Sequence, residues 1–370
     1  MIPTLPKNMA NQTIFLFLCS AILGLLSCSA QSPTMMLSTS PQQIQVLNHS
    51  QREIPESLQL FPIRQNGQEG YINSTGLIII EPKFDEVSGF SEGLALVRIG
   101  DKWGYIDKSG QIVIKPNFDS AYSFFEGLAA VKIDGKMGYI NQTGKLVIPP
   151  QFDLTYRFSE GMAAVRIEID KWGYIDRNGK IVIKPGFGDS GDFHQGLALV
   201  RRDEGTMFIN KTGQIIIKPS DGFLRKFSEG LAAIRVGNKV GYIDTTGRMV
   251  IAPQFNEGYD FSEGRALVLT DVIGINWKAP LTTNTKYGYI DKTGQMAIKP
   301  QFEGAVVFSE GLAAVKIADK WGYINKTGQI VIKPQFDLPS AFFGGLAIVY
   351  IGDEWGYIDM TGKYVWNPTK

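Results

Sequence analysis

The words "DKWGYIDKSGQIVIKPNF" occupy Asp101 to Phe118, and nearly the same letters return twice more along the chain. They read "DKWGYIDRNGKIVIKPGF" from Asp170 and "DKWGYINKTGQIVIKPQF" from Asp319. The aromatic residue of the Gly-Tyr-Ile core recurs at intervals of 34, 34, 35, 34, 34, 47, 34 and 34 residues, as Tyr71, Tyr105, Tyr139, Tyr174, Phe208, Tyr242, Tyr289, Tyr323 and Tyr357. A second marker, Phe-Ser-Glu-Gly, keeps the same step. The chain is therefore a tandem repeat.

Each unit of about 34 residues contains four apolar pieces separated by breaks that carry Gly. In residues 118–150 the pieces are FDSAYSF, LAAVKI, MGYI and KLVI, a pattern that predicts short strands joined by tight turns. We expect an all-β array of about nine antiparallel β-meander units, because one meander cannot bury both of its faces. A propeller-like ring is favoured over an open β arc or superhelix. The first unit lacks its first strand, so a ring would either recruit residues 29–56 or close without that strand.

The break after Gly-Tyr-Ile begins with Asp or Asn in all nine copies, and Gly follows three residues later. The Asp or Asn side chain caps a type I turn, and Gly supplies the positive φ of a hairpin with a bulge. The predicted structural turn residues are Gly76, Gly110, Gly144, Gly179, Gly213, Gly247, Gly294, Gly328 and Gly362.

Other recurring letters also predict structural roles. The prolines after the "IVI" pieces are expected to stop strands, because proline lacks an N–H. The Gly of each Trp-Gly-Tyr predicts a bulge or a close backbone approach, and the tryptophan before it predicts packing. These prolines are Pro116, Pro185, Pro219, Pro253, Pro300 and Pro334, and these tryptophans are Trp103, Trp172, Trp321 and Trp355.

The N-terminal segment has a different character from the repeats. Residues 1–27 carry one charge, Lys7, and an apolar run of 13 residues from Ile14 to Leu26. The run is shorter than the ~20 residues of a membrane-spanning helix and is typical of a signal peptide. "LLSC" resembles a bacterial lipobox, which implies that Cys28 is the lipid attachment site. Residues 28–56, rich in Ser, Gln, Thr and Pro, then predict a flexible tether ahead of the repeat region at 57–370.

The repeating unit resembles the bacterial WG repeat, also called the KWG repeat, whose signature is Trp-Gly followed by Tyr-Ile-Asp and a Thr-Gly or Ser-Gly turn. The resemblance covers about residues 57–370. The fifth copy, "TMFINKTG" from Thr206, loses both Trp and Gly, and the first copy loses the Trp. The resemblance implies an interaction module or scaffold without shared chemistry.

Charge and motifs exclude several functional classes. The chain has 37 Lys+Arg against 36 Asp+Glu, so it lacks the basic excess of a nucleic-acid-binding protein. Lysines and glutamates recur with the repeat and predict solvated rows of like charge. We find no zinc-ligand spacing, no phosphate-binding loop and no hydrolase motif, and predict no cofactor, no metal and no enzymatic activity.

Two interruptions of the repeat carry the candidate sites. In "GFGDSGDFHQG", Ser190, Asp192 and His194 stand at alternate positions and would share one face of a strand, which makes them a weak candidate for an acid–base or metal site. The 13-residue excess before Tyr289 predicts an inserted loop at about 269–285, which carries Trp277 and Lys278. Such loops often lie on the binding face of repeat proteins, and an aromatic residue is a common anchor. Packing of Trp277 back onto the array is the alternative.

These observations predict a non-catalytic binding or scaffold module, tethered as an extracytoplasmic lipoprotein on the periplasmic side or the cell surface. Its partner is expected to be an envelope protein or polysaccharide, with membrane contact through the lipid alone. The alternatives are an enzyme that acts on envelope polysaccharide and a passive structural spacer. An enzyme requires that the polar residues that interrupt the repeat converge in one pocket, and a spacer requires no concave patch.

Overall fold

The computed structural model describes residues 58–219, 223–271 and 285–369. All of them belong to one compact unit, Glu56–Lys370, which is separate from the unit Met1–Pro55. Cys28, the predicted signal peptide and the predicted tether lie outside the described residues, as do Trp277 and Lys278. None of the described segments is a helix that is long and apolar enough to cross a membrane.

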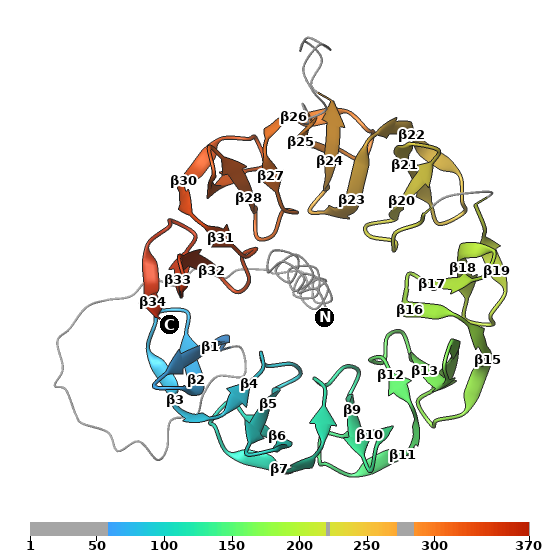
Figure 1. Cartoon of the computed structure of the whole chain (residues 1–370), viewed down its shortest axis with the longest axis vertical. Coiled ribbons are helices and arrows are strands. Elements are labelled where there is room, and N and C mark those ends of the chain that lie inside the picture. Colours follow the sequence, from blue (N-terminus) through green and yellow to red (C-terminus); the bar gives the residue numbers. More distant parts are fainter. Residues whose placement is uncertain (1–57, 220–222, 272–284, 370) are drawn as a thin grey trace, which may run out of the picture. The chain divides into compact units, whose positions relative to one another are not determined.

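Within these residues, 34 strands form nine antiparallel sheets, which are the blades of a nine-bladed β-propeller (Figure 1). The propeller-like ring favoured from the sequence is confirmed. We number the blades 1 to 9 along the chain. In the described residues seven blades have four strands in sequential order, and blades 1 and 6 have three. The described part of the inner segment of blade 6 pairs with β20 through two isolated bridges, Leu224 with Ile234 and Ser228 with Leu231.

In each blade the strands run in order from the axis of the ring to its perimeter (Figure 1). The innermost strands are β4 (Glu86–Val87), β8 (Ser120–Ala121), β12 (Leu154–Thr155), β16 (Asp189–His194), β23 (Glu257–Ser262), β27 (Gly304–Ala305) and β31 (Leu338–Pro339). The second strands are β1 (Leu60–Gln65), β5 (Leu94–Ile99), β9 (Leu128–Ile133), β13 (Met162–Glu168), β17 (Leu197–Arg202), β20 (Leu231–Val236), β24 (Arg265–Asp271), β28 (Leu312–Ile317) and β32 (Leu346–Ile351).

The third strands are β2 (Gln68–Asn73), β6 (Lys102–Asp107), β10 (Lys136–Asn141), β14 (Lys171–Asp176), β18 (Gly205–Asn210), β21 (Lys239–Asp244), β25 (Thr285–Ile290), β29 (Lys320–Asn325) and β33 (Glu354–Asp359). The outermost strands are β3 (Ile78–Phe84), β7 (Ile112–Phe118), β11 (Leu146–Phe152), β15 (Ile181–Phe187), β19 (Ile215–Ile217), β22 (Met249–Phe255), β26 (Met296–Phe302), β30 (Ile330–Phe336) and β34 (Tyr364–Thr369). Phe118 therefore ends an outermost strand, whereas the sequence assigned it to the start of an innermost one. The inserted segment leaves blade 7 after Asp271 and returns at Thr285.

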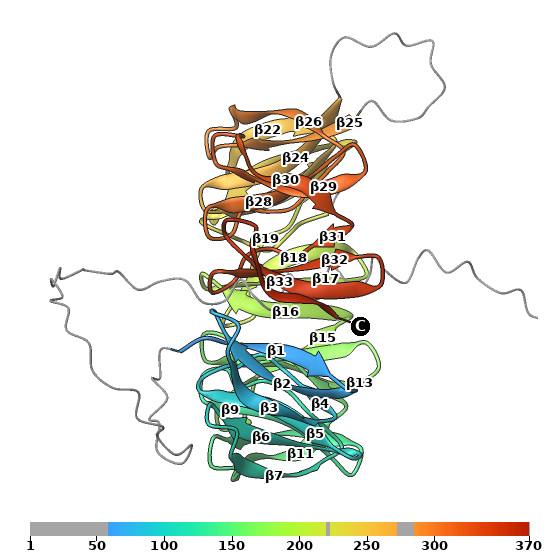
Figure 2. The same cartoon turned by 90° about the vertical axis from the view of Figure 1, so that its left-hand side faces the viewer.

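The ring closes where blade 9 packs directly against blade 1 (Figures 1 and 2). The Tyr357 hydroxyl donates a hydrogen bond to the Pro62 carbonyl oxygen at 2.9 Å, and the Tyr357 and Phe61 ring centroids lie 5.6 Å apart. Both aromatic residues belong to one buried cluster with Leu346 and Ile72. Blade 1 thus closes the ring without an innermost strand among the described residues, and these contacts exclude the open array.

The turn between the third and outermost strands has the chemistry that the repeat predicts. In blade 2, Asp107 Oδ1 accepts hydrogen bonds from the N–H groups of Ser109 at 2.9 Å and Gln111 at 3.1 Å. The Gly110 N–H donates to the Asp107 carbonyl, and the strand register shifts just beyond the turn. All nine turn glycines have φ between 80° and 86°. A Cβ on Gly110 would also lie 2.9 Å from Ile80 Cγ2 of blade 1, so the turn touches the preceding blade.

Replacement of Gly110 by valine should lower the free energy of unfolding by about 1–3 kcal/mol, because a β-branched residue is strained at positive φ. The matched control is Gly135→Val, at φ +82° with no heavy atom within 4 Å of its Cβ position. Chemical denaturation of both variants measures the strain in Gly135→Val and the added clash with Ile80 in Gly110→Val. A loss below about 0.5 kcal/mol in both would contradict the strain argument.

Five of the six prolines do not stop the strands as predicted, whereas β19 ends at Ile217, two residues before Pro219. Pro116 lies inside β7, and Pro185, Pro253, Pro300 and Pro334 occupy the same place in their blades. At this point the outermost strand bulges beside the Gly of Trp-Gly-Tyr. The two backbones approach closely there, since a Cβ on Gly104 would lie 2.5 Å from the Ile114 carbonyl oxygen and 2.6 Å from the Pro116 nitrogen. A proline is tolerated in an edge strand at a bulge, because no neighbouring strand requires an N–H donor at that position.

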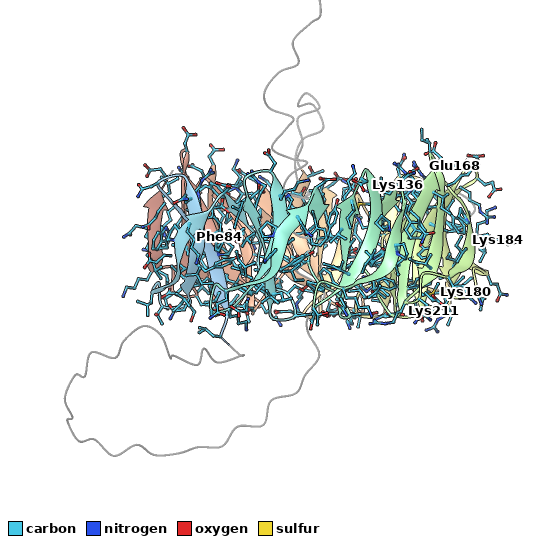
Figure 3. The ribbon with its side chains drawn as sticks, turned by 90° about the horizontal axis from the view of Figure 1, so that it is seen from below. Phe84, Lys136, Glu168, Lys180, Lys184 and Lys211 are labelled. Carbon is cyan, nitrogen blue, oxygen red and sulfur yellow. The ribbon has the colours of Figure 1, made fainter. Side chains whose placement is uncertain are left out.

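The two faces of the ring carry different turns. Figure 3 shows Lys136 and Glu168, from hairpins between second and third strands, at one face, and Lys180 and Lys211, from turns between third and outermost strands, at the other. Lys184 of β15 points outward at the perimeter in the same view.

The recurring lysines at the first face pair with acidic residues at the blade corners, for example Lys320 with Asp337 at 2.5 Å. A hydrogen bond from Lys320 holds the pKa of Asp337 below its usual value.

Candidate functional site

Several residues that recur in the repeat form contacts between one blade and the next. At the boundary between blades 4 and 5, the Tyr174 hydroxyl donates to the Gly191 carbonyl oxygen at 2.8 Å, and its ring lies 4.9 Å from that of Phe193. The Ser159 hydroxyl donates to the Phe193 carbonyl oxygen at 2.7 Å. Burial raises the pKa of Tyr174 above its usual value, so its hydroxyl stays a proton donor at neutral pH.

The glutamate of Phe-Ser-Glu-Gly completes this set of contacts. Glu160 has a φ of +52° in the two-residue turn between innermost and second strands, and its carboxylate accepts the Gly196 N–H of blade 5 at 3.0 Å. Lys211 of blade 5 lies 3.2 Å from the same carboxylate. We call the Tyr, Ser and Glu hydrogen bonds the interblade latch. The predicted solvated row of glutamates is therefore wrong, because each of these carboxylates binds the neighbouring blade, at Glu92, Glu126, Glu160, Glu229, Glu263 and Glu310.

Blade 5 has lost every side chain that would latch it to blade 6. Phe208 stands in place of the tyrosine, His194 in place of the serine and Gln195 in place of the glutamate. Thr245 of blade 6 replaces the basic partner. The boundary keeps its apolar contacts, with the Phe208 and Phe227 ring centroids 4.6 Å apart. Among the described residues, this boundary is thus joined by apolar packing at the positions where other blades add hydrogen bonds.

Restoring the latch should stabilise the ring. The double variant Phe208→Tyr, Gln195→Glu should raise the free energy of unfolding by about 1–3 kcal/mol, since each hydrogen bond contributes about 0.5–1.5 kcal/mol. Tyr105→Phe, which deletes a 2.8 Å bond to the Tyr122 carbonyl oxygen, should lower it by about 1 kcal/mol. Urea titration of the three proteins is the measurement. No gain in the double variant combined with no loss in Tyr105→Phe would mean that the latch hydrogen bonds contribute nothing.

The three polar residues of the predicted weak site point to different neighbours. A bulge between Ser190 and Phe193 breaks the alternation of β16, so the shared face expected from the sequence does not form. Ser190 is 7% exposed and faces the Tyr174 hydroxyl, while Asp192 forms an ion pair with Arg157 of blade 4 at 2.8 Å. Burial and the nearby Lys226 lower the pKa of His194. In the described ranges no group of three or more His, Cys, Asp or Glu side chains could hold a metal ion.

Asp192 instead belongs to a row of charges on four consecutive blades. In each blade from 4 to 7, a charged residue directly precedes the phenylalanine of the Phe-Ser-Glu-Gly element. These residues are Arg157, Asp192, Lys226 and Asp260, and we call them the inner charged arc. Arg157 pairs with Asp192, and Lys226 lies 4.0 Å from Asp260. Asp260 Oδ1 is buried without a hydrogen-bond partner, and burial raises the pKa of this carboxyl. Four of the other five blades have uncharged residues there, namely Gly89, Ser123, Val307 and Ala341, so the fold does not require the charges.

A shallow recess lies between blades 6 and 7, next to this arc. In blade 4, Tyr156 stacks on Trp172 with ring centroids 4.8 Å apart. Blade 6 has Arg225 and Val240 at those two positions, so the volume that two aromatic rings occupy in blade 4 is partly open. We call it the blade 6–7 recess; its lining residues are Phe223, Arg225, Ala233, Arg235, Val240, Glu257 and Gly258.

The insertion starts beside this recess. Asp271, the last residue of β24 before the insertion, accepts a hydrogen bond at 2.8 Å from Asn256, which links blade 6 to blade 7. Lys239 of blade 6 lies 3.8 Å from the same carboxylate. Asn256 directly precedes Glu257 of the recess wall. The missing latch, the inner charged arc, the recess and the base of the insertion therefore gather on blades 4 to 7.

Comparison with known proteins then identifies the repeat. The family profile described as WG containing repeat matches residues 70–103, 103–136, 137–168, 172–205, 207–239, 241–271, 287–321 and 321–355. The chain belongs to the WG repeat family. The resemblance seen in the sequence is confirmed. A propeller built of WG repeats indicates a binding or scaffold module.

Solved structures resemble this WG-repeat propeller in fold. A eukaryotic initiation factor matches with a TM-score of 0.58 and 10% identity over 83% of this chain and 94% of that chain. BamB from Moraxella catarrhalis matches with a TM-score of 0.44 and 13% identity over 82% of this chain and 98% of that chain. At 10% identity the likeness to the initiation factor concerns the fold alone. No curated protein matches the WG-repeat chain.

The recess residues of this WG-repeat protein were not predicted as a site. One signal was available, since Val240 replaces the tryptophan of the repeat and Arg225 replaces an aromatic residue found in three other blades. Each change taken alone is an ordinary substitution. Only the packing of blade 6 on blade 7 shows that the two changes empty the same volume.

Proposed function

We propose that this protein is a non-catalytic binding module, tethered by a lipid on Cys28 and displayed on the bacterial envelope, where it binds a protein partner. The observation that carries the binding role is the concentration of repeat departures on blades 4 to 7. Insertions in repeat proteins map to loops on one face, which is often the binding face. The base of the insertion and the recess share the face of the hairpins between second and third strands, because the insertion joins β24 to β25 and Arg235 pairs with Val240 beside the β20–β21 hairpin. A passive spacer would not require its departures from the repeat to be concentrated on a few blades.

The geometry at Ser190, Asp192 and His194 supports a binding role over a catalytic one. A nucleophile and its base must lie within hydrogen-bond reach of each other. Among the described residues no hydrogen bond joins Ser190 or Asp192 to His194, and Asp192 pairs with Arg157 instead. The enzyme alternative requires the interrupting polar residues to converge on one reacting centre. Across the described blades they instead line an arc and a recess.

Trp277 and Lys278 enter the proposal as a second contact. They belong to the insertion, whose two flanking strand ends, Asp271 and Thr285, pair in blade 7 beside the recess. We propose that they extend the binding face of blades 4 to 7.

Envelope display predicts that Cys28→Ser releases the protein from membranes. Without the thiol no lipid can be attached, so the variant should leave the detergent phase and appear as a precursor or an alternatively cleaved form. Phase partition and mass measurement of the two proteins test this. Unchanged partition of Cys28→Ser into the detergent phase would reject the lipid anchor.

Partner capture tests the binding role. The full-length protein, cross-linked in intact cells and purified, should retain a discrete envelope protein. A variant with Arg157, Asp192, Lys226 and Asp260 all replaced by serine, the residue that blade 3 carries there as Ser123, removes both members of each ion pair. Because no charge is then left buried without its partner, this variant should lose that protein and keep its melting temperature. Equal capture by both would remove blades 4 to 7 from the proposed binding face.

A further inference from the structure

The boundary between blades 5 and 6, which lacks the interblade latch, carries a histidine at one of the latch positions. His194 ends β16 and stands where blade 4 has Ser159. The Ser159 hydroxyl crosses to the Phe193 carbonyl oxygen of the next blade at 2.7 Å. Among the described residues no hydrogen bond joins the His194 imidazole to blade 6. Histidine changes its charge close to neutral pH, so this latch position holds a group whose charge depends on pH.

The two blades meet across this boundary through apolar side chains. The buried cluster between them consists of Leu197, Phe208, Ile217, Leu224, Phe227, Ala232, Ile234 and Ile243. In the described ranges no ion pair joins blade 5 to blade 6, whereas Lys211 pairs with Glu160 across the neighbouring 4–5 boundary at 3.2 Å. Apolar packing does not offset the desolvation of an ion, so this boundary is sensitive to a charge that forms at its edge.

The charged groups packed around His194 come from both sides of the boundary. Burial is the largest cause that lowers the pKa of His194, and the positive charges of Lys226 in blade 6 and Arg157 in blade 4 lower it further. Asp192 of β16 and Glu160 of blade 4 act in the opposite direction. The net result is a pKa below the usual value, so the closed ring favours the neutral imidazole.

A proton on His194 acts unequally on the two sides. The attractive carboxylates of Asp192 and Glu160 belong to blades 5 and 4, on the same side of the boundary as the imidazole. The charge that acts on the imidazole from blade 6 is the cation Lys226. Asp260 also interacts with His194, but it belongs to blade 7. A positive charge at His194 is therefore attracted toward blades 4 and 5 and repelled by blade 6.

We propose that the boundary between blades 5 and 6 is a pH-sensitive seam, which loosens when His194 takes up a proton. The seam divides the inner charged arc into two ion pairs, Arg157 with Asp192 on blades 4 and 5, and Lys226 with Asp260 on blades 6 and 7. Loosening moves the two pairs apart, and with them the two halves of the binding face proposed above. This consequence rests on the proposed function, whereas the seam itself does not.

The direction of the effect follows from which form binds the proton more tightly. In the open seam His194 meets water and recovers the usual histidine pKa of about 6.5. In the closed ring its pKa is lower, so the closed form loses stability as the pH falls through about 6.5. Asp260 acts in the opposite direction, because burial raises its pKa and acid then favours the closed form. A variant that changes only the histidine separates the two effects.

Cysteine labelling of the full-length protein tests the seam. Ala232 and Ala313 occupy the same place in blades 6 and 8, and both are 1% exposed within clusters that cross a boundary. Ala232→Cys reports on the seam, and Ala313→Cys reports on the latched boundary between blades 7 and 8. The ratio of their maleimide labelling rates removes the pH dependence of the thiol itself. From about pH 7.5 to about pH 5.5 this ratio should rise about threefold or more, because histidine in the open form is mostly protonated at the lower pH.

Histidine variants assign the effect, with each label located by peptide mass spectrometry. His194→Gln removes the titrating group and should make the labelling ratio independent of pH. His49→Gln, the matched control, changes the other histidine of the chain and should behave like the wild type. Melting curves give a second measurement without added cysteines, since the wild type should lose more stability on acidification than His194→Gln.

Two outcomes would overturn the seam. They are a labelling ratio that stays constant in the protein with His194, and a ratio that rises equally in His194→Gln. Partner capture at the two pH values keeps the proposed function separate. If an envelope protein is retained while the ratio stays constant, the binding role stands and the seam falls. If the ratio rises while no envelope protein is captured at either pH, the seam stands and the binding role falls.

Discussion

Trp172→Ala should destabilise the propeller by about 3–5 kcal/mol, the range for removal of a large buried aromatic side chain. Trp172 is 5% exposed and stacks on Tyr156 at an interplanar angle of 21°. It belongs to the cluster between blades 4 and 5, together with Phe187 and Met207. The alanine variant leaves a cavity at that boundary. Thermal and urea unfolding measure the loss, and partner binding should fall only as far as the folded fraction falls.

The other three tryptophans of the repeat give a graded comparison, because they are only half-buried. Trp321→Ala should therefore cost less than Trp172→Ala, on the order of 2 kcal/mol. Trp277→Ala should behave in the opposite way. It should leave the melting temperature within about two degrees and weaken the partner at least tenfold, a loss of about 1.4 kcal/mol. Early melting of Trp277→Ala with normal binding would make the insertion a structural plug.

Gly173→Val should cost about 3 kcal/mol or more, because it forces a side chain into packed backbone. A Cβ there would lie 2.6 Å from the Ile183 carbonyl oxygen and 2.7 Å from the Pro185 nitrogen. Both atoms are main-chain, so no rotation of a neighbouring side chain relieves the clash. The bulge that joins β14 to β15 would have to open.

Gly186→Val in the neighbouring strand β15 is the matched control, since no heavy atom lies within 4 Å of its Cβ position. It should change the free energy of unfolding by less than about 0.5 kcal/mol, as surface substitutions usually do. Denaturation curves of the two variants compare the same substitution in two paired strands of one blade. Similar losses for both would show that the close approach at Gly173 is not what the repeat preserves.

Local backbone features could be predicted from the amino-acid sequence. The Asp107 turn, the positive φ of Gly110 and the close approach at Gly104 each depend on residues a few positions apart or on one adjacent strand. Turn geometry and backbone sterics act over that range, so the amino-acid types are enough to predict them. The number of blades followed in the same way from the count of repeats.

Contacts between blades were misread because their partners stand about 35 residues apart in the chain. Glu160 meets the Gly196 N–H, and nothing near Glu160 in the sequence indicates this hydrogen bond. The prolines were misassigned for a related reason. Pro116 lies in an outermost strand. The residues of a strand do not by themselves indicate whether that strand lies at the edge or in the middle of its sheet.

The repeat pattern alone was enough for the all-β class, the nine units and the family, because these depend on periodicity and turn residues that recur in every copy. Ring closure at Tyr357 and Pro62, the missing latch beside Gln195 and the recess beside Arg225 depend instead on which residues of neighbouring blades face one another. The physical reason is that a blade buries its faces only against other blades. The packing that creates both stability and a binding surface therefore exists only in the assembled ring.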